Sequence, residues 1–461
     1  MSIATAHSAA AEFKDTTMAG FRRRLSGSLV LPSDERYPAA CRVWNGRIDK
    51  RPAAIAYCAT REDVIACLGF ACDAGVPLAV RGGGHNIAGK CLCEGGLVVD
   101  LSRMNRVTVD APARTACAQG GALLADLDAA TQAHGLATTT GVNSDTGLVG
   151  LTLGGGFGRL GRKHGLSCDN LLSAEVVAAN GRILRASERE NADLFWALRG
   201  GGGNFGAVTA IVYRLHPLGP MVLAGSLVYP WAKARAALKL YAEFSSAAPD
   251  EIAADAGLVT LPNGERAASI SVFCAGPVDA AERALRPLRA ALKPLEDRIR
   301  PIPYIELQRG ADATFPHGDR YYWKAQFVRA IPDAAIDALL ERFPAAPSPR
   351  SLFVFQQVGG AIARVAADAT AYANRDAAYD AFPVSIWTDP AHDEANVAWA
   401  TETYEAMRPF GTRGVYVNNL GDEGEERVRA AYGPNFERLA AIKRKFDPEN
   451  AFNANQNVAP R

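Results

Sequence analysis

The sequence RGGGHNIAG at residues 81–89 decides the fold, and it directly follows a short apolar run at residues 78–80. Consecutive glycines let several backbone N–H groups converge on one point, and a phosphate group is the usual ligand of such a loop. Arg81 is expected to supply a positive charge for that phosphate. The stretch therefore predicts a strand followed by a phosphate-binding loop.

Two further glycine loops lie at residues 154–158 and 200–206, and a GxGxxG spacing occurs in each region. Gly206 leads into a strand pattern, whereas a Rossmann fingerprint opens a helix, so an NAD dehydrogenase is disfavoured. The first loop approximates a P-loop, but Cys91 stands where Ser or Thr must hold Mg²⁺, which disfavours a nucleotide hydrolase. Three glycine loops favour an extended diphosphate cofactor that the backbone approaches at several points. Three ordinary tight turns are the alternative.

Length and charge exclude several classes of protein. The 461 residues predict about two or three domains, or one large domain with a long insertion. Hydrophobic residues make up 48% and charged residues 21%, which is typical of a folded globular protein. The 50 Lys and Arg against 49 Asp and Glu give a net charge of +1, without the basic excess that marks nucleic-acid binding. We therefore expect no nucleic-acid partner.

The cysteines and apolar segments predict a cytoplasmic protein with neither a metal site nor a membrane partner. The nine cysteines form no CxxC pair and mostly have apolar neighbours, as buried thiols do. The apolar stretch after Arg22-Arg23-Arg24 ends within a few residues, too soon for an export signal. No run of about 18 apolar residues occurs, so we expect no transmembrane helix.

The chain divides into four parts. Residues 1–35 lack clear periodicity and predict a loose arm with one short helix at most, whereas residues 36–217 carry short strands, helices and the glycine loops. Residues 218–412 alternate longer helices and strands, which indicates an inserted α+β domain, and residues 413–461 return to short turns. In the inserted part we predict helices near 233–246, 279–291, 333–342 and 392–408 and strands near 268–274, 321–328, 351–357 and 382–388.

Several motifs together give a specific resemblance. Trp44-Asn45-Gly46, the RGGGHN loop, Cys168-Asp169-Asn170-Leu171 and Tyr416-Val417-Asn418 are among the segments that carry it, from about residue 35 to the end. They resemble the berberine bridge enzyme-like branch of the vanillyl-alcohol oxidase and p-cresol methylhydroxylase (PCMH) flavoproteins. The resemblance implies an α+β fold: a PCMH-type FAD-binding domain of two α+β subdomains, and an inserted substrate domain of antiparallel sheet covered by helices.

The resemblance also implies the cofactor contacts. In this family the histidine of the RGGGH motif is bonded to the 8α-methyl group of FAD, and here that residue is His85. Many members add a second link from a cysteine, but Asn143 occupies that position, so a single covalent bond is expected, with Cys168 in the core. A loop histidine without such a role is the alternative. The implied FAD contacts are Arg81, Gly82, Gly83, Gly84, Asn86, Gly89, Thr146, Gly147, Gly150, Leu151, Gly154, Gly155, Gly156, Gly158, Gly206, Val208, Asn418, Asn455 and Asn457.

The catalytic residues are less defined. The family counterpart of Thr146 lies close to the reactive edge of the flavin, where a hydroxyl could position dioxygen. Some relatives carry a tyrosine immediately after the Tyr-x-Asn motif, but this chain has Asn419, which leaves Tyr416 as a weak candidate for the base. Strand alternation offers further substrate-site candidates, each of which could equally be cavity wall or core: Tyr322, Gln356 or Gln357, and Trp387.

The resemblance predicts an FAD-dependent oxidase. Such an enzyme takes a hydride from a small or medium organic substrate to flavin N5 and passes the electrons to O2, giving H2O2. A polyketide-like or aromatic secondary metabolite is the first expectation for the substrate. An oxygenating tailoring enzyme, an O2-insensitive flavin dehydrogenase and a non-catalytic flavin-binding protein are the alternatives. Monomer and homodimer both stay open.

Overall fold

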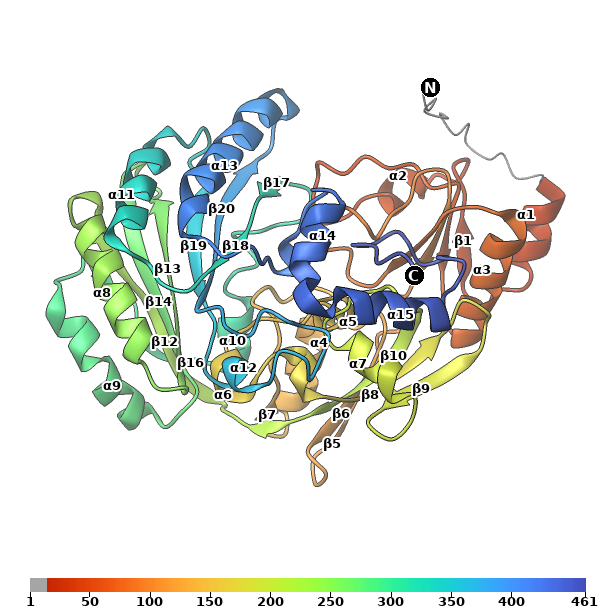
Figure 1. Ribbon diagram of the computed structural model, residues 1–461, viewed down its shortest axis with the longest axis horizontal. Helices are drawn as coiled ribbons and strands as arrows, with labels where there is room; N and C mark the ends of the chain where they lie inside the picture. The colour runs from red at the N-terminus through yellow and green to blue at the C-terminus, as the bar shows by residue number, and fades with distance from the viewer. Residues whose placement is uncertain (1–14) are drawn as a thin grey trace.

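The computed structural model describes residues 15–461, arranged as two halves that share one long chain (Figure 1). One half carries β1 to β10 together with the C-terminal helices, and the other carries β12 to β20 with helices on its outer face. Among the described helices, none has the length and apolar character that crossing a bilayer requires. The α+β architecture predicted from the sequence is confirmed.

The first sheet has the strand order β1-β2-β4-β3, and β4 runs parallel to both β2 and β3. Its main helix, α3, begins at a capping box between Thr60 and Asp63 and ends at Gly75, whose φ of 61° suits glycine. The elements are β1 (Ser28–Val30), α2 (Tyr37–Ala40), β2 (Ala54–Tyr57), α3 (Arg61–Ala74), β3 (Leu78–Arg81) and β4 (Leu97–Asp100).

The predicted N-terminal arm, 1–35, is not loose from residue 15 onward. Helix α1 (Asp15–Arg22) buries Met18 and Phe21, and the Phe21 ring stacks on Phe70 of α3 with ring centroids 4.2 Å apart. Strand β1 then pairs with β2. The hydrophobic contacts of this segment therefore make it part of the first sheet layer, whereas residues 1–14 lie outside the described residues.

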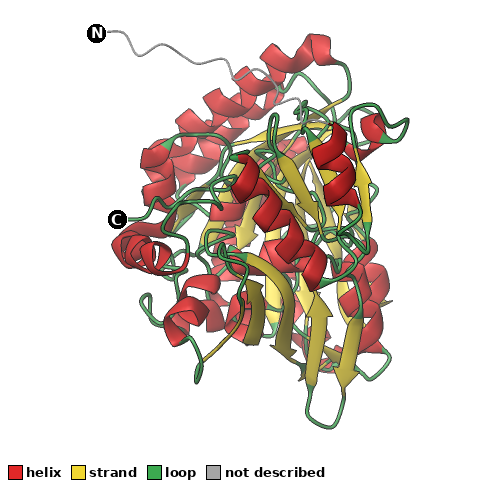
Figure 2. Cartoon of the chain, turned by 90° about the vertical axis from the view of Figure 1, so that its right-hand side faces the viewer, coloured by secondary structure: helices red, strands yellow, loops and turns green. Residues whose placement is uncertain are grey.

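The second sheet is antiparallel, with the order β5-β6-β10-β8-β9, and Figure 2 views the half of the molecule that contains it. The predicted hairpin at Asn180-Gly181 is confirmed between β8 and β9, with Gly181 at a φ of 75°. The elements are β5 (Val107–Asp110), β6 (Thr115–Gln119), α4 (Leu124–Gln132), β7 (Leu136–Ala137), α5 (Leu148–Leu153), α6 (Gly161–His164), β8 (Leu171–Val177), β9 (Ile183–Ser187), α7 (Ala192–Leu198), β10 (Ala207–Arg214) and β11 (His216–Pro217).

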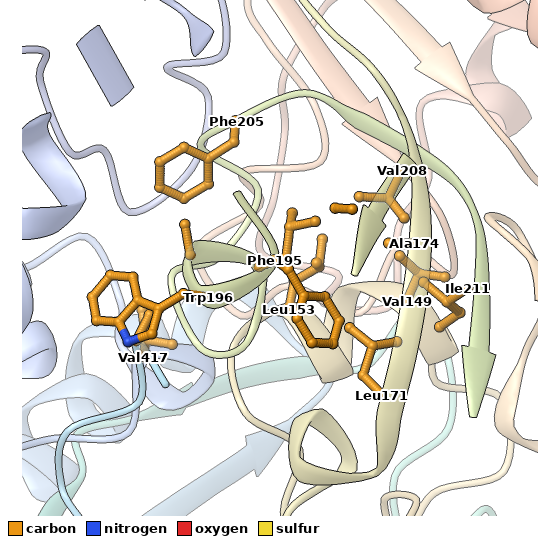
Figure 3. Close-up of a cluster of buried hydrophobic side chains, with 14 of the residues drawn as sticks. Val149, Leu153, Leu171, Ala174, Phe195, Trp196, Phe205, Val208, Ile211 and Val417 are labelled. Carbon is orange, nitrogen blue, oxygen red and sulfur yellow. The ribbon is translucent and has the colours of Figure 1, made fainter. Parts of the chain in front are cut away.

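A hydrophobic core joins this sheet to the helices that carry the second and third glycine loops. Figure 3 shows Leu153 of α5 and Phe195 of α7 packed beside Ile211 of β10. Phe205, directly before the end of the third loop, is fully buried in the same cluster. Burial of these side chains fixes the backbone from which the glycine loops extend.

The third sheet has nine strands in an antiparallel path, β15-β12-β14-β13-β19-β20-β17, with β16 paired to β12 and β18 to β20. The strands are β12 (Met221–Pro230), β13 (Ile252–Thr260), β14 (Arg266–Cys274), β15 (Glu296–Asp297), β16 (Arg300–Pro303), β17 (Arg320–Trp323), β18 (Gln326–Val328), β19 (Leu352–Gln357) and β20 (Tyr379–Trp387). The helices of this part are α8 (Ala234–Ala247), α9 (Val278–Ala291), α10 (Tyr304–Arg309), α11 (Asp333–Arg342), α12 (Ala361–Arg364) and α13 (Asp393–Met407). The four helices predicted here are confirmed, and so are the strands at 268–274, 351–357 and 382–388, whereas the strand predicted at 321–328 is broken into β17 and β18. The strands β12, β13, β15 and β16 and the helices α10 and α12 were not predicted.

The chain then returns to the first half through α14 (Glu425–Tyr432) and α15 (Phe436–Phe446) (Figure 1). Helix α15 holds the third glycine loop by a buried cation. Lys443 Nζ donates to the carbonyl oxygens of Asn204 and Phe452 at 2.7 and 2.9 Å and to Asp447 Oδ2 at 2.6 Å. We therefore propose the predicted division at 217 and 412, with residues 15–35 joined to the first domain.

Lys443→Met tests this anchor. Both charges of the Lys443–Asp447 pair are fully buried, so removing the lysine leaves an uncompensated carboxylate and is expected to cost ~3–5 kcal/mol of unfolding free energy. The measurement is chemical denaturation of wild type and variant. Lys445→Met is the matched control, because its largely exposed pair with Asp193 predicts a loss below ~1 kcal/mol. Equal losses in the two variants would contradict the anchoring role.

Candidate functional site

One cavity of about 860 Å³ lies between the glycine loops and the third sheet. The first domain contributes backbone from all three loops, and β12, β13, β14, β19 and β20 contribute the opposite wall. Of the expected FAD contacts, the structure places the following on the wall: Gly82, Gly83, Gly84, His85, Asn86, Thr146, Gly147, Gly150, Leu151, Gly158, Gly206, Val208, Asn418 and Asn455. A backbone wall of this kind lets a ligand approach the main chain directly.

The first glycine loop meets the segment just before α5 at its backbone, and the second glycine loop meets the backbone at residue 140. A Cβ atom on Gly83 would lie 2.3 Å from the backbone nitrogen of Gly147, and one on Gly158 would lie 1.5 Å from the carbonyl oxygen of Thr140. Only glycine fits at such distances. These glycines therefore line the cavity and also allow the neighbouring backbone segments to pack against each other.

Some expected contacts lie away from the wall. Arg81 is buried, and its guanidinium forms a short contact with Asp100 and donates to the carbonyl oxygen of Ala40 at 2.7 Å. The prediction that Arg81 supplies charge to the cavity is therefore wrong, because Asp100 already pairs with it. The other expected contacts that are not wall residues are Gly89, Gly154, Gly155, Gly156 and Asn457.

Lys90 is the cation that the sequence analysis passed over at this loop. It lines the cavity, and its Nζ donates to Asp422 Oδ1 at 3.1 Å, a carboxylate that is 83% exposed. A solvated partner neutralises a cation only weakly. The P-loop-like order of Gly84, Gly89 and Lys90 was the signal that could have identified it.

His85 lies among aromatic and charged side chains. Its ring stacks on Trp44 with centroids 4.9 Å apart, and burial lowers the pKa of its imidazole. Nε2 lies 2.8 Å from Asp145 Oδ1, but the contact is not aligned as a hydrogen bond, so Nε2 is a buried nitrogen without a hydrogen-bond partner in the described part of the chain. Nδ1 is not among those fully buried atoms, and His85 lines the cavity.

Asp145 bridges His85 to a second histidine. Its Oδ2 lies 2.9 Å from His317 Nε2. Burial alone would raise the pKa of Asp145, but the close contacts with the His317 and His85 rings hold this pKa well below its usual range. The ligand atoms of these three residues also lie within 4.8 Å of one another, a spacing that would admit a metal ion, although no metal was predicted from the sequence.

Tyr416 and Asn418 hold the second glycine loop. The Tyr416 hydroxyl accepts from the backbone N–H of Gly156 at 2.9 Å and from Asn418 Nδ2 at 2.7 Å. Asn418 Nδ2 also donates to the carbonyl oxygen of Leu151 at 2.9 Å. Burial raises the pKa of Tyr416, so its hydroxyl stays protonated at neutral pH and is not available to accept a proton. These contacts favour an anchoring role for Tyr416.

The candidates chosen by strand alternation lie on strands as predicted, but some of them are on the face of the sheet away from the cavity. Tyr322 packs against the outer core, whereas its neighbour Trp323 lines the cavity and donates from Nε1 to the carbonyl oxygen of Asn419 at 3.1 Å. Trp387 also lies off the wall, where its Nε1 donates to Asp393 Oδ1 at 2.8 Å. The predictions of Tyr322 and Trp387 as wall residues are therefore wrong.

The two glutamines differ in their hydrogen bonds. Gln357 touches the cavity, but its side chain is held by the backbone of Ser245 and Ala254 at 2.6 and 2.9 Å. Gln356 also lines the cavity, on the opposite face of β19, and none of its side-chain atoms is hydrogen-bonded to residues 15–461. Gln356 is therefore the glutamine free to contact a ligand.

Asp255 of β13 is the residue of greatest chemical interest that the sequence analysis missed. It lines the cavity, accepts from the backbone N–H of Gln357 at 2.8 Å, and burial raises its pKa to about 6. Arg159, on the opposite wall, donates to Gln308 Oε1 at 2.7 Å and lies close enough to lower the pKa of Asp255 in part. The Ala-rich sequence around Asp255 gave no signal that a strand would carry it into a cavity.

Asp380 lies behind Asn419. Asn419 lines the cavity and its Nδ2 donates to Asp380 Oδ2 at 2.7 Å. Asp380 is fully buried, its Oδ1 has no hydrogen-bond partner among residues 15–461, and burial raises its pKa to about 7. Asn419, at the position where some relatives were expected to carry a tyrosine, therefore lies between this buried carboxyl and the cavity.

The residues present fit an FAD molecule. The cavity has glycine backbone along one side, a cation in Lys90, and two wall residues with a buried polar atom that lacks a partner, Asn143 Oδ1 and Asn455 Oδ1. Buried polar atoms without partners are rare in folded proteins and mark places where a ligand completes the hydrogen bonding. The expected cofactor and the observed walls agree.

Comparison with known proteins gives the same result. The model of an FAD binding domain matches residues 52–187, and the model described as "Berberine and berberine like" matches residues 415–459. (R)-6-hydroxynicotine oxidase of Paenarthrobacter nicotinovorans is 32% identical over 449 residues, covering 95% of this chain and 97% of the relative. An FAD-linked oxidoreductase of Dictyostelium discoideum is 30% identical, covering 95% and 96%.

Solved structures agree in fold. The crystal structure of 6-hydroxy-D-nicotine oxidase from Arthrobacter nicotinovorans superposes with a TM-score of 0.87 at 30% identity, covering 95% of this chain and 98% of that one. Xylooligosaccharide oxidase from Myceliophthora thermophila, in complex with xylobiose, gives 0.86 at 26% identity, covering 96% and 99%. The predicted fold class is confirmed, with 95% and 96% of this chain covered by the two structures.

Gly83→Ala tests the backbone wall. The added methyl group would collide with Gly147, so the loops must separate, and we expect FAD binding to weaken by roughly 10–100-fold, equivalent to ~1–3 kcal/mol. Flavin absorbance per chain measures the loss. Gly69→Ala is the control, because Gly69 lies exposed in α3 with open space around it. Full flavin content in Gly83→Ala would show that the contact is dispensable.

Proposed function

Since the chain belongs to the berberine bridge enzyme-like family of FAD-linked oxidoreductases, we propose that it is an oxidase. In this proposal it removes a hydride from a C–H bond of a small or medium organic molecule, and O2 takes the electrons as H2O2. One observation carries the proposal: a single cavity joins the glycine-walled cofactor site, with His85, to a sheet wall that bears the carboxyl of Asp255. The nine free cysteines support a reducing, cytoplasmic location.

We assign the FAD contacts to residues of the cavity wall. In the proposal, His85 carries the single covalent 8α link, and the backbone of the first two loops holds the diphosphate and the chain next to it. Lys90 offsets phosphate charge, and Asn418 and Asn455 complete the wall from the C-terminal segment. When bound, FAD supplies the two-electron acceptor that dioxygen can reoxidise.

The sheet wall defines the class of substrate. Trp323, Phe382 and Val384 give it an aromatic and aliphatic surface, whereas its polar residues are Gln356, Gln357, Asp255 and the serines Ser226, Ser269 and Ser271. A largely apolar wall with few polar groups suits a ligand that has an aromatic or alicyclic body and one or two hydroxyl or amine groups. We therefore propose an aromatic or polyketide-like molecule as the substrate.

Asp255 is the general base in this proposal. It is a carboxyl group on the substrate wall, and a pKa of about 6 leaves it mainly ionised at neutral pH, yet more basic than an exposed aspartate. It would accept the O–H or N–H proton of the substrate as the hydride leaves. Arg159 on the facing wall stabilises the ionised form. Tyr416, with its raised pKa and its loop contacts, is thereby replaced as the candidate base.

Thr146 is proposed as the group that positions dioxygen. It lines the cavity, and its backbone carbonyl accepts from the N–H of Leu124 at 3.0 Å, which fixes the position of Thr146 just before α5. The hydroxyl makes no hydrogen bond to residues 15–461 and is free to contact a small polar ligand.

Reoxidation of reduced enzyme tests the oxidase proposal without a known substrate. The purified protein is photoreduced in the absence of air and then mixed with aerated buffer. We expect fast reoxidation and one H2O2 per flavin, with Thr146→Val slower by about tenfold because it removes a hydrogen bond worth ~1.4 kcal/mol. Slow reoxidation of wild type would favour the dehydrogenase alternative. Equal rates in Thr146→Val would remove Thr146 from the proposal.

The pH profile of Asp255→Asn tests the base. With a substrate found in a peroxide-coupled screen, wild-type kcat/KM should rise as the pH increases through about 6 and then level off, because only the ionised carboxylate accepts a proton. Asp255→Asn should lose ~10²–10⁴-fold in kcat/KM and lose this rise.

Asp380→Asn is the matched control, a buried carboxyl with raised pKa that does not line the cavity. In Asp380→Asn, kcat/KM should still rise as the pH increases through about 6. If the rise in kcat/KM near pH 6 instead remains in Asp255→Asn and disappears in Asp380→Asn, the base assignment is wrong.

A further inference from the structure

Three segments far apart in the sequence bring His85, Asp145 and His317 together at the edge of the cavity. Asp145 lies between the two histidines, with Oδ1 2.8 Å from His85 Nε2 and Oδ2 2.9 Å from His317 Nε2. The two rings meet edge to face, with centroids 5.3 Å apart. Neither Asp145 nor His317 has a part in the proposed oxidation.

Asp145 is held in place from its own loop. Asn143 Nδ2 donates to Asp145 Oδ1 at 3.0 Å, and the next residue, Ser144, donates its N–H and hydroxyl to the Asp312 carboxylate at 2.8 and 2.6 Å. These three polar contacts restrain the short segment from which the Asp145 side chain extends. The carboxylate is therefore preorganised beside His85.

His317 is held by the segment that carries Trp44. The N–H of Gly318 donates to the carbonyl oxygen of Trp44 at 3.0 Å, and the N–H of Gly46 donates to that of Asp319 at 2.7 Å. Trp44 in turn stacks on the His85 ring. The same short ladder that places His317 beside Asp145 thus also supports His85.

The charges of the cluster give the two nitrogens of His85 different roles. Burial lowers the pKa of His85, so the imidazole is neutral, whereas Asp145 stays ionised between two imidazoles. A carboxylate beside Nε2 favours the tautomer that carries its proton on Nε2. The lone pair then lies on Nδ1, the ring nitrogen that is not fully buried.

We propose that Asp145, supported by His317, is a positioning residue that prepares His85 to form its covalent bond with the 8α carbon of FAD. The inference rests on the proposed function, since it requires FAD in this cavity. In the step, Nδ1 forms a bond to C8α, C8α loses one proton, His85 loses its Nε2 proton, and the flavin gains two electrons. Dioxygen then takes these two electrons and both protons as H2O2, so the step balances with the oxidant of the proposed reaction.

The cluster also gives the released proton a route. As the bond forms, the His85 ring becomes cationic, and Asp145 is the nearest acceptor for its Nε2 proton. His317 lies on the other side of Asp145 and is 51% exposed, so it can exchange with solvent. A buried His85 without this pair would have to keep the charge in a desolvated site, which is costly.

The test follows covalent attachment, separately from turnover. Wild type, Asp145→Asn, His317→Asn and His85→Ala are produced with limiting riboflavin, incubated with excess FAD in air and quenched in acid at intervals. Intact mass then gives the fraction of chains that carry one FAD. Asp49→Asn is the matched control, since it removes an exposed carboxylate that pairs only with Arg51. Flavin absorbance before quenching reports FAD that is bound without a covalent bond.

We expect Asp145→Asn to slow attachment by at least ~10-fold and His317→Asn by a smaller factor, both with FAD still bound before quenching. Asp49→Asn should follow wild type, and His85→Ala should form no adduct. Attachment at the wild-type rate in Asp145→Asn would overturn the inference and leave the proposed function intact. Wild type without any adduct would instead overturn the proposed link itself. One metal ion per chain in the purified protein, lost in Asp145→Asn, would also contradict the inference, because the cluster would then be a metal site.

Discussion

The contact between the backbones of Gly83 and Gly147 is the constraint on which the rest of the structure depends. Cβ atoms on these residues would lie 2.3 and 2.4 Å from the backbone nitrogen of the other, so neither position admits a side chain. Because the loops touch, the RGGGHN segment and the segment that follows Gly141 form one wall. His85 and Asp145 meet for the same reason, since each lies within two residues of this contact.

Three aspartates at or near the cavity differ in how their surroundings shift the pKa. Asp145 lies between two histidines, which keep its pKa low and its carboxylate charged. Asp255 is buried in the sheet wall, where the Gln357 N–H and the charge of Arg159 offset burial only in part, so its pKa rises to about 6. Asp380 lies deeper still, beside Asn419, and its pKa rises to about 7. The same side chain can therefore stay charged or exchange a proton, and its surroundings decide which.

Local signals made much of the fold predictable from the sequence. The Asn180-Gly181 turn and the capping box at Thr60 depend on neighbours in the chain, and so do the long amphipathic helices. Contacts between distant strands were not predictable in this way. The alternation along β17 predicts that every second side chain faces the cavity, but it does not say which set does. Tyr322 was therefore chosen, whereas its neighbour Trp323 lines the cavity. Likewise, the parallel pairing of β3 with β4 puts Arg81 opposite Asp100, which removes its charge from the site.

In our proposal, FAD lies along the glycine wall and is tied to His85 through Nδ1, the ring nitrogen that is not fully buried. A crystal structure of the protein purified with its flavin tests this most directly. We expect continuous electron density from Nδ1 of His85 to C8α of the isoalloxazine, with Asp145 remaining beside Nε2. Density that ends at the imidazole ring, or a bond through Nε2 with Asp145 displaced, would contradict it.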